Sequence, residues 1–263
     1  MFKHIVLVEI LVHLRKKEKP FDYIDTHAGA GLYDLRSEHA NKLKEHALGI
    51  GSLSPEDWPE LSAYFEVIQA YNESKSLIFY PGSPLIAMHF LRRQDRAWLY
   101  ELHPTDFELL GHNTRKKTQI RILREDGFKG LLSLLPPLSR RGLVLIDPSY
   151  EIKSDYEQVF ISVVKAYKKF PTGTYAIWYP VVDRKKIDSL EKSFVKSDIK
   201  DIQRFEFGLS TDSDERGMTS SGMIVVNPPW GLFEKMLALL PKLLRSSAAN
   251  DDASFKCDIL VSE

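Results

Sequence analysis

The sequence predicts an α/β protein built on a doubly wound, mostly parallel sheet with helices on both faces. Short aliphatic runs alternate with longer segments of helical periodicity between residues 21 and 226. One run, LVLI at 143–146, is continuous and apolar, as in a strand buried on both faces. Another run ends in the small-residue turn DTHAGAG at 25–31, the place where such a sheet brings backbone close to a ligand.

Composition limits the class of protein. The 263 residues are 43% hydrophobic, enough for one large core and a small inserted subdomain. The single cysteine, Cys257, excludes an internal disulfide and a cysteine-based zinc site and favours the reducing cytoplasm, and we predict no metal site. Lys plus Arg and Asp plus Glu each total 36, so nucleic-acid binding would need a local basic patch.

The first segment predicts an amphipathic helix that packs on the sheet. Apolar residues recur at helical spacing from Ile5 to Val12, basic residues 15–17 occupy the last turn, and Pro20 lies just beyond. Glu9 interrupts the apolar run and no cleavage site follows, which argues against a signal peptide. The run is also too short to cross a membrane, so we expect no membrane association.

The next strand, 21–25, leads into the turn at 25–31, where Gly29 would let backbone approach a ligand. This turn lacks the full G-x-G-x-x-G pattern, so by itself it could be a tight strand-to-helix turn. An acid that binds ribose hydroxyls usually follows such glycines by about 20 residues, at the end of the second strand. The candidate, Glu101, lies 70 positions after Gly31, which fits only if a subdomain is inserted.

We place this inserted helical subdomain at residues 35–82 and the main domain at 1–34 and 83–263. Residues 37–72 are rich in Ala, Leu, Glu and His and predict two or three short helices. Ser83 and Pro84 then fit the N-cap and first position of a helix over 85–93. We favour capping as the role of Ser83, although a capped helix N-terminus can still face a ligand.

Strands and helices continue to alternate after Glu101. The strands expected after the first two are at 120–123, 143–146, 174–179, 202–207 and 223–226, giving a seven-stranded sheet, with a final short strand at 258–261. The helices are expected at 105–114, 128–135, 155–170, 183–195 and 232–244. Asp126, before Gly127, could accept a hydrogen bond from an adenine amine or cap the helix that follows.

The stretch GLVLIDPSYE at 142–151 is the candidate reaction site. Asp147 follows a buried strand, where parallel sheets bind ligands, and Pro148 and Tyr150 follow it. Methylation of an exocyclic amine needs carboxylate and carbonyl oxygens to accept its N–H bonds, and an aromatic ring to stack on the base. The same residues could instead form a strand that simply ends in a proline turn.

A second tetrapeptide, Asn227 to Trp230, matches the acid-or-amide, proline, proline, aromatic pattern more closely. Its place after the seventh strand argues against it, because the glycine turn and Glu101 place the cofactor across strands one and two, beside strand four. We therefore predict that it ends a strand and begins the helix at 232–244.

Together these motifs resemble the RlmJ family, bacterial adenine-N6 methyltransferases of 23S ribosomal RNA. The resemblance is nearly full length and rests on DTHAGAG (25–31), YPGSPLIA (80–87), ELHP (101–104), EDGF (125–128), SRRGLVLIDPSYE (139–151), GTYAIWYPVV (173–182) and DSDERGMTSSGMIVVNPPW (212–230). It implies a Rossmann-like class I methyltransferase fold with S-adenosylmethionine as methyl donor. The cofactor contacts that it implies are His4, His27, Ser83, Glu101, Asp126 and Gly127, with Asp147 at the target amine.

The chain departs from the family pattern at two places. Ser149 stands where the family tetrapeptide, Asp-Pro-Pro-Tyr, has its second proline, and we expect a looser base pocket and weaker catalysis. The family also usually begins with a further segment rich in Tyr, Arg, His and Asn, of which only residues 2–4 remain, so we expect that this chain starts late.

The function expected is N6-methylation of an adenine that is flipped out of structured 23S ribosomal RNA, by a cytoplasmic monomer. Asp147 and the Pro148 carbonyl would hold the amine, and Tyr150 would stack on the base. Two alternatives remain open: methylation of adenine in DNA, and a catalytically weakened RNA-binding homologue. Among the basic residues, Arg140 and Arg141 precede the catalytic strand and so should lie at the opposite end of the sheet. Long loop 208–222, with Arg216 at its centre, is expected to be functional or disordered.

Overall fold

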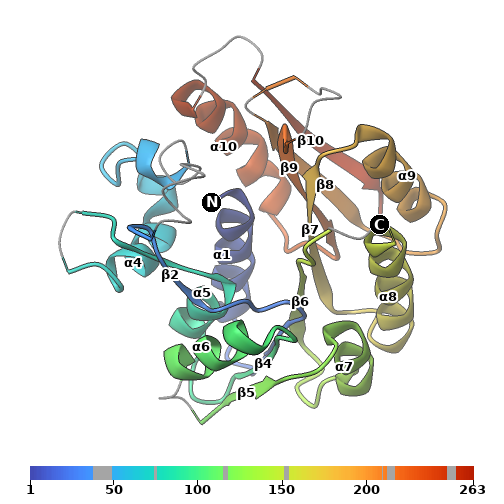
Figure 1. Ribbon diagram of the computed structural model, residues 1–263. Helices are drawn as coiled ribbons and strands as arrows, with labels where there is room; N and C mark the ends of the chain where they lie inside the picture. The colour runs from blue at the N-terminus through green and yellow to red at the C-terminus, as the bar shows by residue number, and fades with distance from the viewer. Residues whose placement is uncertain are drawn as a thin grey trace.

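An eight-stranded mixed sheet separates two layers of helices (Figure 1). The computed structural model describes residues 1–37, 49–73, 76–114, 118–150, 154–208, 210–211, 217–247 and 253–263. In spatial order the strands are β10 (Ser254–Val261), β8 (Ile202–Gly208), β9 (Ser220–Val226), β7 (Thr174–Val181), β6 (Gly142–Ile146), β1 (Asp22–Asp25), β4 (Arg96–Tyr100) and β5 (Ile120–Leu123). The α/β prediction with a mainly parallel sheet is therefore confirmed.

The strand count of seven was wrong. The final strand, expected only at 258–261, extends over the whole of β10 and pairs antiparallel with β8, so it joins the sheet as an eighth strand. The five strands from β5 to β7 are parallel, whereas β9 runs antiparallel to β7 and β8 antiparallel to β9. This change of direction decides which loops share the edge that holds Asp147.

Strand β6 shows why the aliphatic run at its centre is a strand. Its five residues are all buried. Leu143 and Leu145 belong to the hydrophobic core on one face of the sheet, and Val144 and Ile146 belong to the core on the other. Burial of each such side chain contributes about 1.5–3 kcal/mol. With β1 on one side and β7 on the other, β6 holds the start of the Asp147 loop firmly.

Different helices cover the two faces of the sheet (Figure 1). On one face lie α1 (Phe2–Arg15), α5 (Ser83–Phe90), α6 (Pro104–Thr114) and α10 (Leu232–Ser247). On the other lie α7 (Gly127–Leu134), α8 (Asp155–Lys169) and α9 (Arg184–Val195). Within the described ranges, no helix has the length and hydropathy needed to cross a membrane.

Helix α1 packs against the sheet as expected, but it is not amphipathic. Both its predicted apolar positions and intervening ones such as Val6, Leu7 and Ile10 are buried. The sheet covers only one side of the helix, while α5 and α4 (Ser62–Gln69) cover others. Glu9, which interrupts the apolar run, is paired with Lys235 of α10 at 2.6 Å.

Two short strands at the ends of the segment predicted as an insertion were not predicted. Strand β2 (Leu32–Asp34) pairs antiparallel with β3 (Phe79–Pro81), and between them lie α4 and the short 3-10 helices η1 (Ile50–Ser52) and η2 (Pro59–Leu61). Three-residue strands are too short to show a periodicity, so only helices were expected. Lys242 of α10 joins this segment to the main sheet domain through Glu60, at 2.6 Å, and through the ring of Trp58.

One prediction concerns residues outside the described ranges. Arg216, at the centre of the loop 208–222, lies in one of those gaps.

Candidate active site

Four strand ends bring acidic residues to one edge of the sheet. Asp25 ends β1, Glu101 follows β4, Asp126 follows β5, and Asp147 follows β6. The register aligns these ends, because Asp25 lies beside Leu99 of β4 and Leu145 of β6. Parallel strands present their carboxyl ends at the same edge, which is where such sheets bind ligands.

Glu101 holds the glycine turn in place. Its Oε2 accepts a hydrogen bond from the N–H of Gly29 at 2.7 Å, and its Oε1 accepts one from the N–H of His103 at 2.7 Å. Gly29 has a φ of +63°, and a Cβ there would lie 2.5 Å from the hydroxyl of Tyr33. The turn therefore needs glycine both for its backbone conformation and for space.

Asp126 caps helix α7. Its carboxylate accepts hydrogen bonds from the N–H groups of Phe128 at 2.9 Å and Lys129 at 3.3 Å. Gly127 lies against the turn after β1, where a Cβ would be 2.0 Å from the Thr26 carbonyl oxygen. The capping alternative is thus confirmed, while contact between Asp126 and an adenine stays a prediction.

Ser83 does not cap α5, contrary to our interpretation. The N-cap is Gly82, and Ser83 is already in the helix. The Ser83 hydroxyl instead donates a hydrogen bond at 2.7 Å to Oδ2 of the buried Asp25, which the hydroxyl of Tyr23 also donates to at 2.7 Å. A buried carboxylate competes successfully for the serine proton because an unsatisfied buried acceptor is costly.

Asp25 should make stability pH-dependent. Burial raises its pKa from 3.8 to about 6, despite the donors Ser83, Tyr23 and His27 N–H. Between pH 4 and 6 the folded state therefore binds this proton more tightly than the unfolded state, and stability falls as pH rises. We expect a loss of about 3 kcal/mol over this window from this group. Urea unfolding should show a smaller decline in Asp25→Asn, and equal declines in the two proteins would contradict the assignment.

Asp147 forms an ion pair with Lys3 of α1. Burial raises the pKa of Asp147, while the charge of Lys3 and its hydrogen bond oppose that rise. The Lys3 ammonium also lies 5.3 Å from the centre of the Trp178 ring. Neither Lys3 nor Trp178 was predicted to belong to the site. The motif at 173–182 contains Trp178, but nothing in the sequence distinguishes it from a core residue.

Tyr150 is packed beside the site and not free at its mouth. It has a φ of +56°, and its hydroxyl donates to the Trp178 carbonyl oxygen at 2.5 Å. Its ring lies 4.6 Å from that of Tyr156 and 6.1 Å from that of Trp178. Pro148 is buried, whereas Ser149 is exposed. Stacking of Tyr150 on a base remains a prediction.

A cavity of about 260 Å³ joins part of the predicted site. Its lining comprises Met1, Lys3, His4, His27, Ala28, Tyr33, Tyr80, Gly82, Ser83 and Asp147. It thus brings together four predicted site residues, namely His4, His27, Ser83 and Asp147. Glu101, Asp126 and Tyr150 are not among its lining residues. Burial lowers the pKa of His27 to about 4, so this ring is neutral near pH 7.

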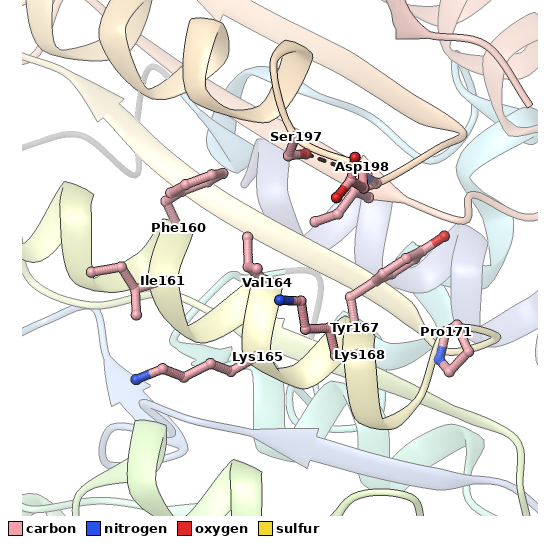
Figure 2. A pocket seen from close by; sticks show the side chains of 10 residues that line it. Phe160, Ile161, Val164, Lys165, Tyr167, Lys168, Pro171, Ser197 and Asp198 are labelled. Atoms are coloured by element: carbon pink, nitrogen blue, oxygen red, sulfur yellow. Dashed lines mark hydrogen bonds between the residues drawn. The ribbon is translucent and has the colours of Figure 1, made fainter.

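A larger hollow lies elsewhere and does not resemble a reaction site. Figure 2 shows Phe160, Val164 and Tyr167 of α8 lining it, with Asp198 across from them. Its volume is about 640 Å³, and it reaches Pro171, just before β7 begins. It therefore extends toward the edge of the sheet opposite Asp147.

Among the described residues, no group of three or more His, Cys, Asp or Glu side chains could hold a metal ion.

The competing tetrapeptide lies at that opposite edge. Because β9 runs antiparallel to β7, Asn227 follows the end of β9 but lies beside the start of β7, and it donates hydrogen bonds to the Pro171 and Gly173 carbonyl oxygens. Trp230 is 92% exposed. Arg141 lies at the same edge, bonded to the Lys19 carbonyl oxygen. The prediction that the tetrapeptide ends a strand and precedes the helix α10 is confirmed, and so is the predicted placement of Arg141.

Comparisons with known proteins find relatives over nearly the full length of the chain. The family described as "Ribosomal RNA large subunit methyltransferase D, RlmJ" matches residues 18–261. Ribosomal RNA large subunit methyltransferase J of Escherichia coli is 48% identical over 92% of this chain and 88% of its own length. The protein of that name from Haemophilus influenzae is 44% identical over 100% of this chain and 95% of its own. A crystal structure from Legionella pneumophila has a TM-score of 0.89 at 34% identity, and covers 98% of this chain and 95% of that one.

Proposed function

The chain belongs to the RlmJ family of large-subunit ribosomal RNA methyltransferases, and on that premise we propose that it methylates the N6 amine of an adenine in 23S ribosomal RNA. S-adenosylmethionine is the methyl donor and supplies an electrophilic methyl group. The observation that carries the proposal is the position of Asp147, at the carboxyl end of β6 and on the wall of a cavity shared with His4, His27 and Ser83.

The residues at the sheet edge suit the parts of the donor. Glu101 has its two carboxylate oxygens engaged by one N–H each, which leaves further lone pairs for ribose hydroxyls. Gly127 and Gly29 let the backbone pack closely at this edge, because a Cβ would clash with the Thr26 carbonyl oxygen or the Tyr33 hydroxyl. At the cavity, the buried Nε2 of His4 has no hydrogen-bond partner among the described residues, an unmet requirement that a bound amino-acid group would satisfy.

The role proposed for Asp147 is to hold the target amine. Its carboxylate and the Pro148 carbonyl would accept the two amine N–H bonds and turn the nitrogen lone pair toward the methyl group. Such positioning accounts for most of the barrier reduction, because the donor is already activated. Lys3 engages the same carboxylate, so this ion pair must loosen or share the carboxylate when a base enters. Tyr150 would supply the stacking face.

Methyl transfer to RNA and to DNA tests the proposal. Purified protein with tritiated S-adenosylmethionine should label 23S ribosomal RNA, and mass mapping of the digested RNA should identify N6-methyladenosine at one position. Duplex DNA of matched adenine content should remain unlabelled. Labelling of DNA alone would assign the enzyme to DNA, and binding of RNA without any transfer would favour a weakened RNA-binding homologue.

Ser149 offers a test of how rigid the site must be. Neither its N–H nor its hydroxyl makes a hydrogen bond within the described part of the chain, so proline removes none. We expect Ser149→Pro to raise kcat by about two- to fivefold, because proline removes about 0.4–1 kcal/mol of ordering cost. Steady-state assays at saturating concentrations of the same RNA would measure this kcat. Ser149→Ala is the control, because it removes the hydroxyl without restricting the backbone. A kcat below that of the wild type would contradict the expectation.

We also propose that residues 35–82 form a separate inserted subdomain, that the enzyme is a monomer, and that it works in the cytoplasm, where ribosomal RNA is found. The two-stranded β2–β3 ladder at the ends of this segment supports the first point. Light scattering would test the second.

A further inference from the structure

Three rings, of the buried His4 and Tyr64 and the partly buried Tyr80, link the inserted segment to the wall of the cavity. Nδ1 of His4, on α1, lies 2.7 Å from the hydroxyl oxygen of Tyr80, on β3. That oxygen lies 2.9 Å from the hydroxyl oxygen of Tyr64, on α4. The His4 and Tyr80 rings also stack, with centroids 5.4 Å apart. Tyr64 is 1% exposed and His4 5% exposed, so water cannot readily replace these contacts.

The direction of the protons in this chain follows from Tyr64. Within the described part of the chain, Tyr80 is the sole hydrogen-bond partner of the Tyr64 hydroxyl. A buried hydroxyl that does not donate leaves its proton away from water and without a hydrogen bond, which costs free energy. Tyr64 therefore donates to Tyr80. Burial raises the pKa of both tyrosines, which keeps both protonated. Tyr80 must then donate its own proton to Nδ1 of His4.

This order fixes the tautomer of His4. Burial, together with the nearby charges of Lys3 and the chain amino group, holds the pKa of His4 well below its usual value, so the ring is neutral. A neutral imidazole that accepts at Nδ1 carries its proton on Nε2. Nε2 is buried and makes no hydrogen bond to any described residue. His4, which lines the cavity together with Asp147, therefore carries a buried N–H donor that no described residue uses.

The surroundings indicate what this donor is set to bind. Gly82 and Ser83, at the N-terminus of α5, border the same cavity. The Gly82 N–H is bonded to the Gly31 carbonyl oxygen and Pro84 has no N–H, so the first turn offers the N–H of Ser83 and a partial positive charge. Lys3 adds a positive charge to the lining. Residues around one small space thus carry donors and positive charge, which suits a carboxylate.

We propose that Tyr64 and Tyr80 are positioning residues that hold His4 in the Nε2–H tautomer, so that it donates to the carboxylate of the donor's methionine portion. The inference rests on the proposed function, because it assumes that S-adenosylmethionine occupies this cavity. It gives the inserted segment a part in cofactor recognition, through residues that never touch the cofactor carboxylate themselves.

Two ligands separate this role from simple packing. S-adenosylhomocysteine carries the carboxylate, whereas methylthioadenosine keeps the nucleoside and lacks the whole amino-acid portion. By calorimetry, Tyr80→Phe should bind S-adenosylhomocysteine about tenfold more weakly, the effect of losing one favourable hydrogen-bond geometry. Its affinity for methylthioadenosine should stay within about twofold. Tyr64→Phe should show a smaller loss of the same kind, because Tyr80 can then either donate or accept.

Tyr71→Phe is the matched control, because Tyr71 lies in the same segment and its hydroxyl has no hydrogen bond to a described residue. Both affinities should be unchanged in this variant. In a His4→Gln background, adding Tyr80→Phe should cause no further tenfold loss, since no tautomer remains to be fixed.

Nitrogen-15 NMR of the histidine side chains reads the tautomer directly. In the wild type, the His4 signals, assigned by their disappearance in His4→Gln, should show Nδ1 unprotonated and Nε2 protonated. In Tyr80→Phe the two signals should shift toward each other. A proton on Nδ1 in the wild type, or equal loss of both ligands in Tyr80→Phe, would overturn the inference. A wild-type protein that binds neither ligand would instead refute the proposed function. The NMR spectrum would still show which nitrogen of His4 carries the proton.

Discussion

Asp147→Ala is expected to lower methyl transfer to RNA by at least about 10²–10³-fold while leaving S-adenosylmethionine binding within a few-fold of the wild type. Loss of a group that acts on the reacting amine has this magnitude when the rest of the site is preorganised. Transfer is measured in single-turnover assays and binding by calorimetry, because together they separate chemistry from donor affinity.

The ion pair with Lys3 requires care in this experiment. Removing Asp147 leaves the Lys3 ammonium without its carboxylate partner, which alone can disturb the site. Asp147→Asn, combined with Lys3→Met, avoids that residual charge and should still lack transfer. Asp198→Ala, on the exposed surface beside the larger hollow, should keep full activity. Turnover above about a tenth of the wild-type value in Asp147→Ala would remove Asp147 from the mechanism.

Gly127→Ala is expected to cost about 3 kcal/mol in the free energy of unfolding, and donor binding should weaken strongly. A methyl group at this position would lie 2.0 Å from the Thr26 carbonyl oxygen, so α7 or the turn after β1 must move. Both segments belong to the proposed cofactor site. Urea unfolding and calorimetry with S-adenosylhomocysteine measure the two effects.

Gly111→Ala provides the contrast. Gly111 lies within α6, and an added Cβ there meets no atom of the described residues within 4 Å. Since alanine is the better helix former, this substitution should stabilise the protein by about 0.5–1 kcal/mol. If the two variants unfolded at the same urea concentration, the close approach at Gly127 would not contribute to the free energy of unfolding.

Local patterns predicted the acidic edge of the sheet well. The aliphatic run before Asp147 identified β6, because only a strand buried on both faces is apolar throughout. Glu101 was expected at a strand end, and it does follow β4, 70 residues after Gly31. Capping, one of the two roles considered for Asp126, could be foreseen since it depends on the next three residues alone.

Contacts between distant segments could not be predicted in this way. Lys3 and Asp147 are 144 positions apart, and His4 and Tyr80 are 76 apart. In the sequence Lys3 was one of 36 basic residues, and only the packing of α1 against the sheet brings it to Asp147. The prediction for Ser83 was wrong for a related reason. Its local pattern fits a cap, but the carboxylate that accepts its hydrogen bond comes from β1, 58 positions earlier.

The place of Trp178 between Tyr150 and Lys3 gives this site an optical reporter. Of the four tryptophans, Trp58 is buried in the inserted segment, Trp98 is hydrogen-bonded to Asp22 at the start of β1, and Trp230 is exposed at the far edge. A neighbouring ammonium interacts with the electrons of an indole ring, so movement of Lys3 should change the emission of Trp178. In a variant that keeps Trp178 as its one tryptophan, fluorescence should therefore report, without a label, the loosening of the Lys3–Asp147 pair that the proposed function requires.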